Sequence, residues 1–478
     1  MSSLPLRPLV VDLDRSLLRC DLLHDALAGL AIRHPSRLVR LALTHRGNLA
    51  AFKSAVAAFV PLDPEHLPRN SEVLEFLRTE AARGRRIILA TASPRTWAEP
   101  IAARLGVFSD VLASSDTVNL KAAQKLADIR SLLGDEPFDY IGDSTDDLPI
   151  FRAATTRHLV GSSPVVSATL RAESLTYADL DAAQSWATAR SLWRLCRPLH
   201  WTKNLLIFLP ALTSLGLYDF SNIWRSLLAF VAMCATASSV YIFNDLTDIA
   251  ADRAHREKKH RPLAAATVSV PAALLLGALL ACLGLGLAAF AGLPALVVLL
   301  VYLLANALYT VHLKEIPLAD VCTLTFFYLL RILLGTSVLG VLPTGWFLSF
   351  LACGLTEIAL WKRYVEVSRS TADKIDRRGY SHADSGVLLV FGIGFSFSAA
   401  LILGLYTQSH EISPVYRTPA LLTLLVPILL IHNLGLWLDG VRGFTSGDPI
   451  MRMLHSRKSW VAALAAALVI ICARSITL

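Results

Sequence analysis

Nothing in the cysteine distribution suggests a structural framework or a metal site. The seven cysteines are scattered over 478 residues, without the spacing of metal ligands and without a pairing pattern. Isolated cysteines of this kind usually act as small apolar side chains. We therefore expect neither a disulfide framework nor a cysteine-bound metal.

Three other features are missing. The opening stretch MSSLPLRPLVVDLDRSLL lacks a cleavable apolar core and already contains acids, so we expect no signal peptide. The net charge is +8, but the basic residues form no stripe interleaved with aromatics. We therefore expect no nucleic acid partner, and the charge suits an anionic membrane leaflet instead. We find no convincing internal repeat, which weighs against a transporter.

Apolar residues, by contrast, are in excess. A hydrophobic fraction of 54% and a mean hydropathy of +0.52 are too high for a soluble protein of this size. Residues 1–190 resemble ordinary globular sequence, whereas the rest is dominated by apolar runs that approach the ~20 residues of a transmembrane helix. We predict an all-α membrane bundle of about nine helices. The runs lie near 204–220, 224–243, 269–291, 294–311, 320–340, 345–361, 385–406, 418–437 and 459–476.

Basic loops predict the orientation of this bundle. The segments 253–261, 362–378 and 442–458 follow the second, sixth and eighth runs and hold most of the loop lysines and arginines. The positive-inside rule places these loops, and the N-terminal part, in the cytoplasm. We therefore expect a multi-pass protein of the inner (cytoplasmic) membrane, with its C-terminus outside.

The N-terminal part alternates strand and helix patterns, which predicts an α/β fold with a parallel sheet. In such sheets the chemistry gathers at the carboxyl ends of the strands. Asp12 and Asp14 follow the first strand pattern, Thr91 ends the second, and Asp143 and Asp147 follow the third. The three strand patterns lie at 9–11, 86–91 and 138–142.

Taken together, these clusters resemble the haloacid dehalogenase phosphohydrolase superfamily. The resemblance implies that Asp12 is the nucleophile that forms an aspartyl-phosphate and that Asp14 is the general acid and base. It implies that Thr91 binds the phosphoryl group and that Asp143 and Asp147 complete a Mg²⁺ site with Asp12. A carboxylate that attacks a phosphate needs such cations to offset the crowded negative charge.

Two points about this domain stay open. The lysine that neutralises the phosphoryl charge is Lys125, which we favour, or Lys121 in the same stretch. Residues 19–75 have mostly helical patterns and are interpreted as a small cap that sets substrate choice. The alternative to an active enzyme is a degenerate, non-catalytic domain.

Three aspartates follow the second apolar run. Asp245, Asp248 and Asp252 are spaced i, i+3 and i+7, so on one helix they would share a face. Carboxylates so placed repel one another unless a cation holds them, and Mg²⁺ held by carboxylates usually takes further ligands from substrate phosphates. The alternative is a solvated helix end with ordinary surface acids.

The C-terminal part resembles the UbiA superfamily of intramembrane prenyltransferases, and within it the polyprenyl-phosphate phosphoribosyltransferases. One departure from aromatic prenyltransferases is that Trp361-Lys-Arg-Tyr-Val-Glu366 replaces a second aspartate-rich motif. The two cations argue against a second metal cluster and favour binding of an additional phosphate. The matching stretches are CRPLHWTKNLLIFLPAL at 196–212, VYIFNDLTDIAADRAHREKKHRPLA at 240–264, LYTVHLKEIPLADV at 308–321 and LWKRYVEV at 360–367.

The resemblance implies transfer of 5-phosphoribose from phosphoribosyl diphosphate to a polyprenyl phosphate. Asp245 and Asp252 would hold Mg²⁺ on the diphosphate, with Asp248 in support, while Asn244 orients the donor. Asp320 would bind ribose hydroxyls or the metal. The alternative for the basic candidates is a snorkelling side chain at the membrane surface. The candidates for binding phosphates are Lys203, Arg261, Lys314, Lys362 and Arg363.

The predicted organisation is therefore a phosphohydrolase domain at 1–165, a linker at 166–195 and a transferase domain at 196–478, with one Mg²⁺ in each domain. The phosphohydrolase would remove the 5-phosphate from the lipid-linked product, for use in a cell-envelope glycan. One alternative is an aromatic-acid or quinone prenyltransferase that uses an isoprenyl diphosphate. Another is a non-enzymatic transport or lipid-binding bundle with a regulatory domain.

Overall fold

The computed structural model divides into two compact units. The first comprises Met1–Pro198 with Ser238–Leu279, and the second comprises Leu199–Ala237 with Leu280–Leu478. Parts of the basic stretches 362–378 and 442–458, on which the predicted orientation rests, lie outside the described residues. The residues that the structure describes are 6–161, 163–181, 188–213, 219–341, 343–369, 379–409, 416–443, 452–453 and 455–476.

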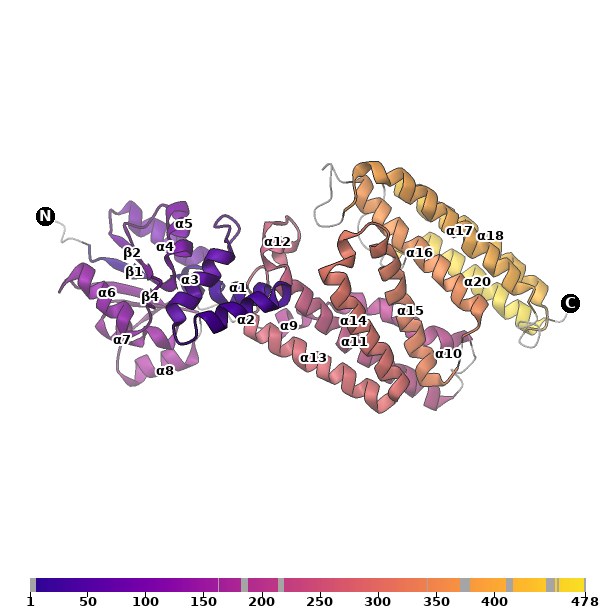
Figure 1. Cartoon of the computed structure of the whole chain (residues 1–478), viewed down its shortest axis with the longest axis horizontal. Helices are drawn as coiled ribbons and strands as arrows, with labels where there is room; N and C mark the ends of the chain where they lie inside the picture. The colour runs from indigo at the N-terminus through magenta and orange to yellow at the C-terminus, as the bar shows by residue number, and fades with distance from the viewer. Residues whose placement is uncertain are drawn as a thin grey trace. The chain divides into compact units, whose positions relative to one another are not determined.

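A six-stranded parallel sheet, with strand order β3-β2-β1-β4-β5-β6, forms the centre of the first unit. Figure 1 labels its strands β1, β2 and β4. The predicted α/β fold with a parallel sheet is confirmed, and all three predicted strands are present. The strands are β1 (Leu9–Val11), β2 (Ile87–Pro94), β3 (Asp110–Ser114), β4 (Asp139–Gly142), β5 (Arg157–Val160) and β6 (Ala178–Leu180).

Helices connect these strands and cover both faces of the sheet. The predicted helical cap at 19–75 corresponds to α1–α3 and the start of α4. The elements are η1 (Leu13–Leu17), α1 (Leu22–Arg33), α2 (Pro35–Thr44), α3 (Leu49–Phe59), α4 (Ser71–Ala82), α5 (Arg95–Leu105), α6 (Ala123–Leu133), η2 (Thr145–Asp147), α7 (Leu148–Ala153), α8 (Pro164–Ala172) and α9 (Ala189–Leu195).

Alternation along the strands explains the two-sided core. Leu9 and Val11 point into a cluster that includes Leu77 of α4 and Ile101 of α5. Val10, between them, points into the opposite cluster, which is formed with residues of α6, α7 and α8. Burial on both faces is typical of parallel sheets and accounts for the continuous apolar runs of the strands.

The sheet continues beyond the predicted domain end at residue 165. Helix α8 and strand β6 occupy 164–180, and β6 pairs in parallel with β5 through His158–Ala178 and Val160–Leu180. The first half of the predicted linker at 166–195 is therefore part of the α/β fold. Residues 182–187 of that linker lie outside the described residues.

The segment 238–279 of the first unit carries the three aspartates. It contains the end of α11 (Phe220–Thr247), α12 (Ile249–Ala254), η5 (Lys258–His260) and the start of α13 (Val270–Ala291). Asp248 is the N-cap of α12, with φ −103° and ψ 12°, so the helix is interrupted there. The prediction that the three acids share a face of one helix is therefore wrong.

Helices make up the second unit. Helix α16 packs against α15, α17 and α18, and α14 packs against α15 (Figure 1). Its elements, beyond the parts of α11 and α13 that it contains, are η3 (Pro198–Phe208), α10 (Leu209–Thr213), α14 (Leu293–Val311), η6 (Leu313–Glu315), α15 (Ala319–Leu339), α16 (Gly345–Ser368), η7 (His382–Asp384), α17 (Ser385–Thr407), η8 (Pro419–Leu424), α18 (Leu425–Val441) and α20 (Arg457–Ser475).

Seven helical segments of the described chain are long and apolar enough to cross a membrane. Two of the nine predicted spans are not among them. The run 345–361 lies in α16, where Glu357 and Lys362 lower the mean hydropathy. The run 204–220 is divided between η3 and α10, and residues 214–218 lie outside the described chain. The seven are Phe220–Thr247, Val270–Ala291, Leu293–Val311, Ala319–Leu339, His382–Thr407, Pro419–Val441 and Arg457–Ser475.

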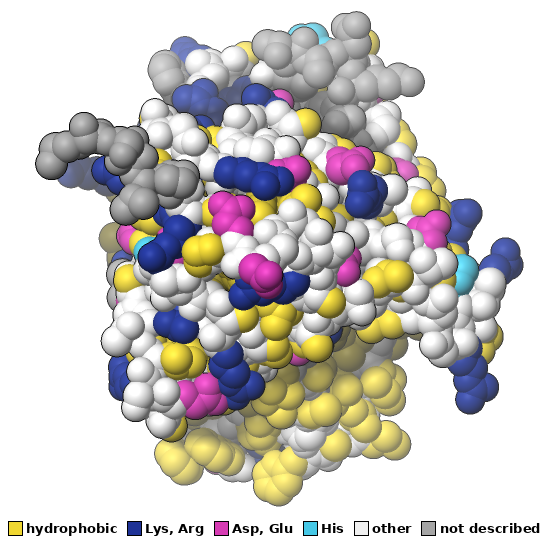
Figure 2. Space-filling model, turned by 90° about the vertical axis from the view of Figure 1, so that its left-hand side faces the viewer, with side chains coloured by type: hydrophobic (Ala, Val, Ile, Leu, Met, Phe, Trp, Pro, Cys, Tyr) yellow, Lys and Arg dark blue, Asp and Glu magenta, His cyan; other side chains and the backbone are white. Residues whose placement is uncertain are grey.

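The two parts of the chain have different surfaces. On the face in Figure 2, the α/β domain shows acidic and basic side chains dispersed among other residues. The helices of the second unit instead expose large apolar side chains such as Leu401, Ile431 and Leu464. Such surfaces are covered by lipid when helices span a membrane. Small residues allow close packing inside the unit, because a Cβ at Gly284 would overlap Thr236 of α11.

Candidate functional site

The first candidate site lies where β1, β2 and β4 end. Asp12 follows β1 directly, is buried, and is held in the sheet by a backbone hydrogen bond from its N–H to Ile141 O at 2.9 Å. The chain then turns sharply through η1, where Arg15 adopts a φ of 61°. A positive φ is uncommon for a residue other than glycine and is strained for a side chain of this size. Asp14, just before Arg15, contacts Thr91 and Ser93 at the end of β2.

Lys125 is the central cation of this site. From α6, its Nζ donates to Asp12 Oδ1 at 2.8 Å and to Asp147 Oδ1 at 3.1 Å. Tyr140 also donates to Asp147 Oδ1, at 2.6 Å. Lys121, the alternative lysine, pairs with Asp146 at 2.9 Å on the exposed surface. Of the two candidates it is therefore Lys125 that contacts the nucleophile position.

Burial and charge set the protonation of this cluster. Burial raises the pKa of Asp12 to about 7, although Lys125 opposes the shift. Burial also raises the pKa of Asp143, and the charge of Asp12 adds to the effect. Burial raises the pKa of Asp147 too, but Lys125 and Tyr140 outweigh it and the net pKa is lowered. With all three carboxylates ionised, the cluster would carry more negative charge than Lys125 offsets, and a further cation would favour that ionised state.

The carboxylates of Asp12, Asp143 and Asp147 can converge on such a cation. One oxygen from each lies within 4.8 Å of the other two, and all three residues are buried. Hard carboxylate oxygens are the ligands that Mg²⁺ prefers. The three residues therefore fit the predicted Mg²⁺ site. Arg15 Nε lies 3.5 Å from Asp143 Oδ2 and adds positive charge at its edge.

Asp14 is held separately from this cluster. Its Oδ2 accepts from Ser93 Oγ at 2.6 Å and, at a longer 3.5 Å, from Thr91 Oγ1, while Oδ1 accepts from Leu22 N at 2.9 Å. Burial raises its pKa to about 6. A carboxyl with this pKa can both donate and accept a proton near neutrality. Ser93 was not among the predicted site residues, although it stands at the same strand end as Thr91.

A cavity of about 390 Å³ opens over these residues. Part of its wall comes from the predicted cap, because Lys53 of α3 lines it. Lys53 Nζ donates to Ala92 O at 3.1 Å and to Asn119 Oδ1 at 2.9 Å. The cap residue is thereby fixed to the end of β2 and to the loop that follows β3. The helical insertion thus contributes directly to the site, as predicted for a cap.

The second candidate site is the aspartate cluster of segment 238–279. Arg261 Nη1 contacts Asp252 Oδ2 at 2.7 Å and Asp245 Oδ1 at 3.3 Å. Arg197 also forms an ion pair with Asp245. Both aspartates are buried, whereas the arginine side chains are 31% and 21% exposed. The two carboxylates therefore converge on one position that a positive charge occupies, and their oxygens suit Mg²⁺.

Asp248 faces a different partner. Arg33, the last residue of α1, donates from Nη2 to Asp248 Oδ1 at 2.8 Å and to Thr247 O at 2.7 Å. One arginine thus binds both the cap aspartate of α12 and a carbonyl at the end of α11. Neither Arg33 nor Arg197 was among the predicted residues. Arg197 stands in the matched stretch CRPLHW and could have been chosen from it, whereas Arg33 has no sequence signal.

In the second unit, Asp320 and Arg363 form a buried ion pair. Arg363 also pairs with Glu366, and Tyr380 donates to Asp320 at 2.6 Å. The charge of Arg363 is therefore balanced within α15 and α16. Arg363 is fully buried, so direct binding of a phosphate by its guanidinium requires a rearrangement around it.

The remaining predicted residues are partly buried. Asn244 directly precedes Asp245 on α11. Lys203 lies on η3, Lys314 on η6 and Lys362 on α16, all in the second unit. Their roles stay predictions.

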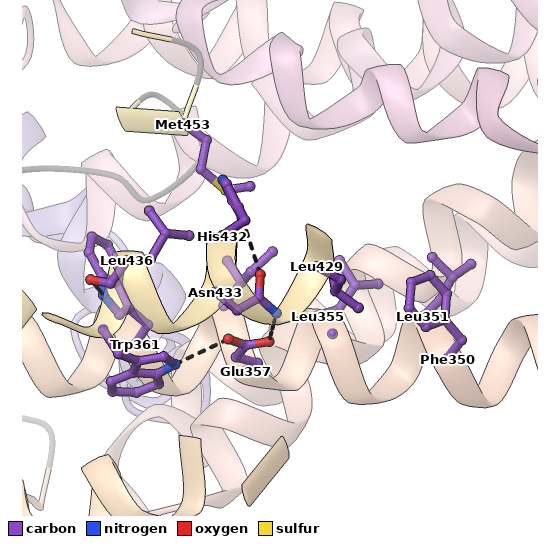
Figure 3. A pocket seen from close by; sticks show the side chains of 13 residues that line it. Phe350, Leu351, Leu355, Glu357, Trp361, Leu429, His432, Asn433, Leu436 and Met453 are labelled. Atoms are coloured by element: carbon purple, nitrogen blue, oxygen red, sulfur yellow. Dashed lines mark hydrogen bonds between the residues drawn. The ribbon is translucent and has the colours of Figure 1, made fainter. Parts of the chain in front are cut away.

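A further pocket of about 210 Å³ lies between α16 and α18 (Figure 3). Its lining is mainly apolar, but it contains the buried carboxyl of Glu357. Asn433 donates to Glu357 Oε2 at 2.6 Å and Trp437 donates to Oε1 at 3.1 Å. Ser396 of α17 donates to the same Oε1. Because these partners come from two neighbouring helices, Glu357 joins three helices.

Two family models match separate parts of the chain. The UbiA prenyltransferase family matches residues 205–443, and the haloacid dehalogenase-like hydrolase family matches residues 9–152. Both matches agree with the resemblances found in the sequence.

Individual relatives cover nearly the whole chain or about half of it. The uncharacterized protein y4nM of Sinorhizobium fredii is 32% identical over 458 residues, which are 95% of this chain and 88% of that protein. The decaprenyl-phosphate phosphoribosyltransferase of Mycolicibacterium smegmatis is 31% identical, over 45% of this chain and 69% of that enzyme. A solved UbiA homolog from Archaeoglobus fulgidus, bound to GPP and Mg²⁺, is 16% identical with a TM-score of 0.45, over 59% of this chain and 97% of that one.

Proposed function

Because the chain belongs to the UbiA prenyltransferase family and carries an N-terminal haloacid dehalogenase-like hydrolase domain, we propose that it performs two consecutive reactions. The membrane part transfers 5-phosphoribose from phosphoribosyl diphosphate to a polyprenyl phosphate. The N-terminal domain then removes the 5-phosphate. The product is a lipid-linked ribose, which suits synthesis of a cell-envelope glycan.

The observation that supports the transfer most directly is the meeting of acids and cations at Asp245 and Asp252. Arg197 and Arg261 contact these acids and remain partly exposed. A donor with three phosphate groups needs both metal ligands and free positive charge. Asp245 and Asp252 would hold Mg²⁺, with Asp248 in support, and the metal would neutralise charge that develops on the diphosphate. The arginines can then turn to the phosphates of the donor.

The transfer itself needs no strong base. The acceptor oxygen belongs to a phosphate that is already anionic at neutral pH, and the leaving group is the diphosphate on the anomeric carbon. The bond from this carbon to the diphosphate breaks as the bond to the lipid phosphate forms. The residues of the chain therefore have to align the two reactants and balance their negative charge. Lys203, Lys314 and Lys362 are proposed to contribute to this balance.

The phosphatase step uses the first site. Asp12 attacks the phosphorus, the bond from phosphorus to the ribose oxygen breaks, and Asp14 donates a proton to that oxygen. Water then hydrolyses the aspartyl-phosphate, Asp14 accepts the proton of the water, and inorganic phosphate leaves. Lys125 balances the charge on the transferred group. Mg²⁺ held by Asp12, Asp143 and Asp147 would supply further charge neutralisation.

The proposed location is the inner membrane, with the N-terminal domain in the cytoplasm and the C-terminus outside. This orientation suits the donor, because a highly charged sugar diphosphate is expected on the side where it is made. Reporter fusions to the C-terminus, active only on one side of the membrane, test the orientation.

The activity test uses the purified full-length protein in detergent with Mg²⁺, labelled phosphoribosyl diphosphate and polyprenyl phosphate. Two lipid products are expected in sequence, first with and then without the 5-phosphate. Asp12→Asn should accumulate the phosphorylated one. Consumption of an isoprenyl diphosphate with an aromatic acceptor, and none of phosphoribosyl diphosphate, would instead establish the aromatic prenyltransferase alternative.

A further inference from the structure

A second cavity, of about 260 Å³, adjoins the phosphatase cavity. Arg15, Asp21 and His24 line both of them, so the two cavities share a wall. The opposite side of the second cavity comes from residues 263–271, which follow the aspartate cluster and lead into α13. All of these residues belong to the first unit.

The segment that forms this opposite side is firmly attached to the α/β domain. Arg253 Nη2 pairs with Asp25 Oδ2 at 2.7 Å, and the two side chains are only 6% and 11% exposed. Arg253 Nε also donates to Ala264 O at 3.1 Å. Ala266, two residues further, is part of the hydrophobic core cluster of the α/β domain. A buried, hydrogen-bonded ion pair of this kind fixes geometry, because opening it would leave a charge uncompensated.

The lining of the second cavity combines positive charge with apolar surface. Its acids already have partners, since Asp25 pairs with Arg253 and Asp21 lies 3.1 Å from His24 Nδ1. Arg19 contacts Asp181 only at 3.5 Å, and its buried Nε has no acceptor within the described part of the chain. The other side contributes the apolar residues Leu263, Val268 and Val270. An anionic group attached to a sugar or a lipid matches this combination.

The apolar side of the cavity continues onto a helix with exposed leucines. Pro271 lines the cavity and stands at the start of α13, a candidate membrane span. One and two turns further, Leu274, Leu275 and Leu279 are exposed by 39%, 63% and 59%. A lipid chain bound along these leucines would start at the edge of the cavity. A water-soluble sugar phosphate would not be stabilised by contact with such an apolar surface.

We propose that this second cavity is the leaving-group subsite of the phosphatase and binds the ribosyl phosphodiester of a lipid-linked substrate. The phosphate to be removed then occupies the neighbouring cavity, next to Asp12. The step is the hydrolysis already described: the bond from phosphorus to the ribose oxygen breaks, Asp14 supplies the proton, and water provides the oxygen of the released phosphate. This assignment rests on the proposed function and adds residues 263–271 to the phosphatase site.

The test uses the full-length protein in detergent micelles and measures phosphate release. The probe is a chemically synthesised farnesyl-phosphoryl ribose 5-phosphate, so that transfer activity is not needed. Ribose 5-phosphate and p-nitrophenyl phosphate serve as esters that lack the lipid phosphodiester. The wild type should show a KM for the farnesyl ester at least about tenfold below that for ribose 5-phosphate, as expected for one added charged contact.

Two variants change the charge of the subsite. Ser269→Asp keeps an N-cap residue at α13, where Ser269 Oγ accepts from Ala272 N, but adds a negative charge to the cavity. Arg19→Gln removes a positive one. Each should raise the KM for the farnesyl ester about tenfold and leave kcat and hydrolysis of p-nitrophenyl phosphate unchanged. Ser163→Asp, at the start of α8, and Arg152→Gln, in an exposed pair with Glu173, are the matched controls.

The outcomes separate this assignment from the proposed function. Equal effects of the variants on all three esters, or no effect on any, would overturn the subsite. So would a wild type that prefers ribose 5-phosphate, or one that hydrolyses p-nitrophenyl phosphate but not the farnesyl ester. If the subsite variants behave as expected while no phosphoribosyl transfer is detected, the subsite stands and the transferase proposal fails.

Discussion

The two acidic clusters of the first unit differ in how their charge is balanced. In the Asp12 cluster the cation is Lys125, whose side chain is 5% exposed and bonded to two carboxylates. In the Asp245 cluster the cations are Arg197 and Arg261, which are 21% and 31% exposed. The lysine is thus fixed within the site, whereas the more exposed arginines are proposed to exchange an aspartate for a phosphate of the substrate.

The backbone is also more regular around the Asp12 cluster than around the Asp245 cluster. The Asp12 cluster is built on the ends of hydrogen-bonded strands, as Asp12 N bonds to Ile141 O. The Asp245 cluster spans a break between α11 and α12 at Asp248. A sheet edge preorganises groups for a reaction on a small, invariant phosphoryl group. A helix break would leave room for adjustment to the larger donor that we propose.

The largest expected effect is a separation of the two activities. Asp12→Asn removes the nucleophile and should lower phosphatase activity by roughly a thousandfold or more, with transfer unchanged. Asp245→Asn should abolish transfer and leave hydrolysis of p-nitrophenyl phosphate intact. Both activities are measured on the same purified samples. Asp128→Asn and Glu257→Gln, at a partly buried and an exposed acid outside the two clusters, should be silent, and loss of both activities in either site variant would contradict two independent sites.

The next effect concerns the free energy of unfolding. It compares removal of the buried Lys125 with removal of the partly exposed Arg261. Lys125→Met leaves two buried carboxylates without their cation and should lower the free energy of unfolding by roughly 3 kcal/mol. Arg261→Gln removes a partly exposed partner and should cost less than about 1 kcal/mol, while transfer activity falls. Thermal unfolding followed by tryptophan fluorescence measures both. Equal destabilisation would show that the two clusters are built alike.

A smaller effect is expected at the helix break. Arg33→Gln removes the contact with Asp248 and should lower transfer about threefold to tenfold, since an exposed ion pair contributes at most about 1 kcal/mol and its hydrogen bonds a similar amount. Phosphatase activity on p-nitrophenyl phosphate should not change. Combining it with Asp248→Asn in a double-mutant cycle isolates the pair. Arg40→Gln, on the exposed side of α2, is the matched control, and additive effects would exclude coupling of Arg33 to Asp248.

Much of the first site could be predicted from sequence because its residues follow strand patterns. Parallel strands end at one edge, so Asp12, Thr91 and Asp143 had to lie near one another once the strands were recognised. The sequence alone does not decide between Lys121 and Lys125. Lys121 lies just before α6 and Lys125 lies in its first turn, so both are close to the same end of the helix. The structure separates them: Lys125 is buried in α6, and Lys121 lies before that helix begins, on the surface.

The second cluster was only partly predictable. The spacing of Asp245 and Asp252 identified the acids, but an uninterrupted helix was the wrong framework, because Asp248 caps a new helix. The partners Arg33 and Asp248 are 215 residues apart, and Arg253 and Asp25 are 228 apart. No local pattern encodes such contacts. They depend on how α1 packs against segment 238–279, which only the folded chain reveals.

The smallest expected difference between the clusters is in how their stability responds to pH. On the side of the Asp12 cluster this response comes from His24, near the start of α1, which lines the phosphatase cavity. A hydrogen bond to Asp21 raises the pKa of His24 above its usual 6.5. The folded state therefore binds this proton more tightly than the unfolded state. The resulting stabilisation is fully present below pH 6.5 and is lost as the pH rises through the higher folded-state pKa. Asp252 is instead paired with Arg261.

The experiment compares thermal unfolding of wild type and His24→Gln at pH 6 and pH 8. Other groups titrate in this interval, including Asp12, so the informative quantity is the difference between the two proteins at each pH. Wild type should exceed the variant at pH 6 and match it at pH 8. Because the His24 side chain is 48% exposed, the gain should stay below about 1 kcal/mol. A gain that is instead larger at pH 8 would mean that neutral His24 is the form the fold prefers.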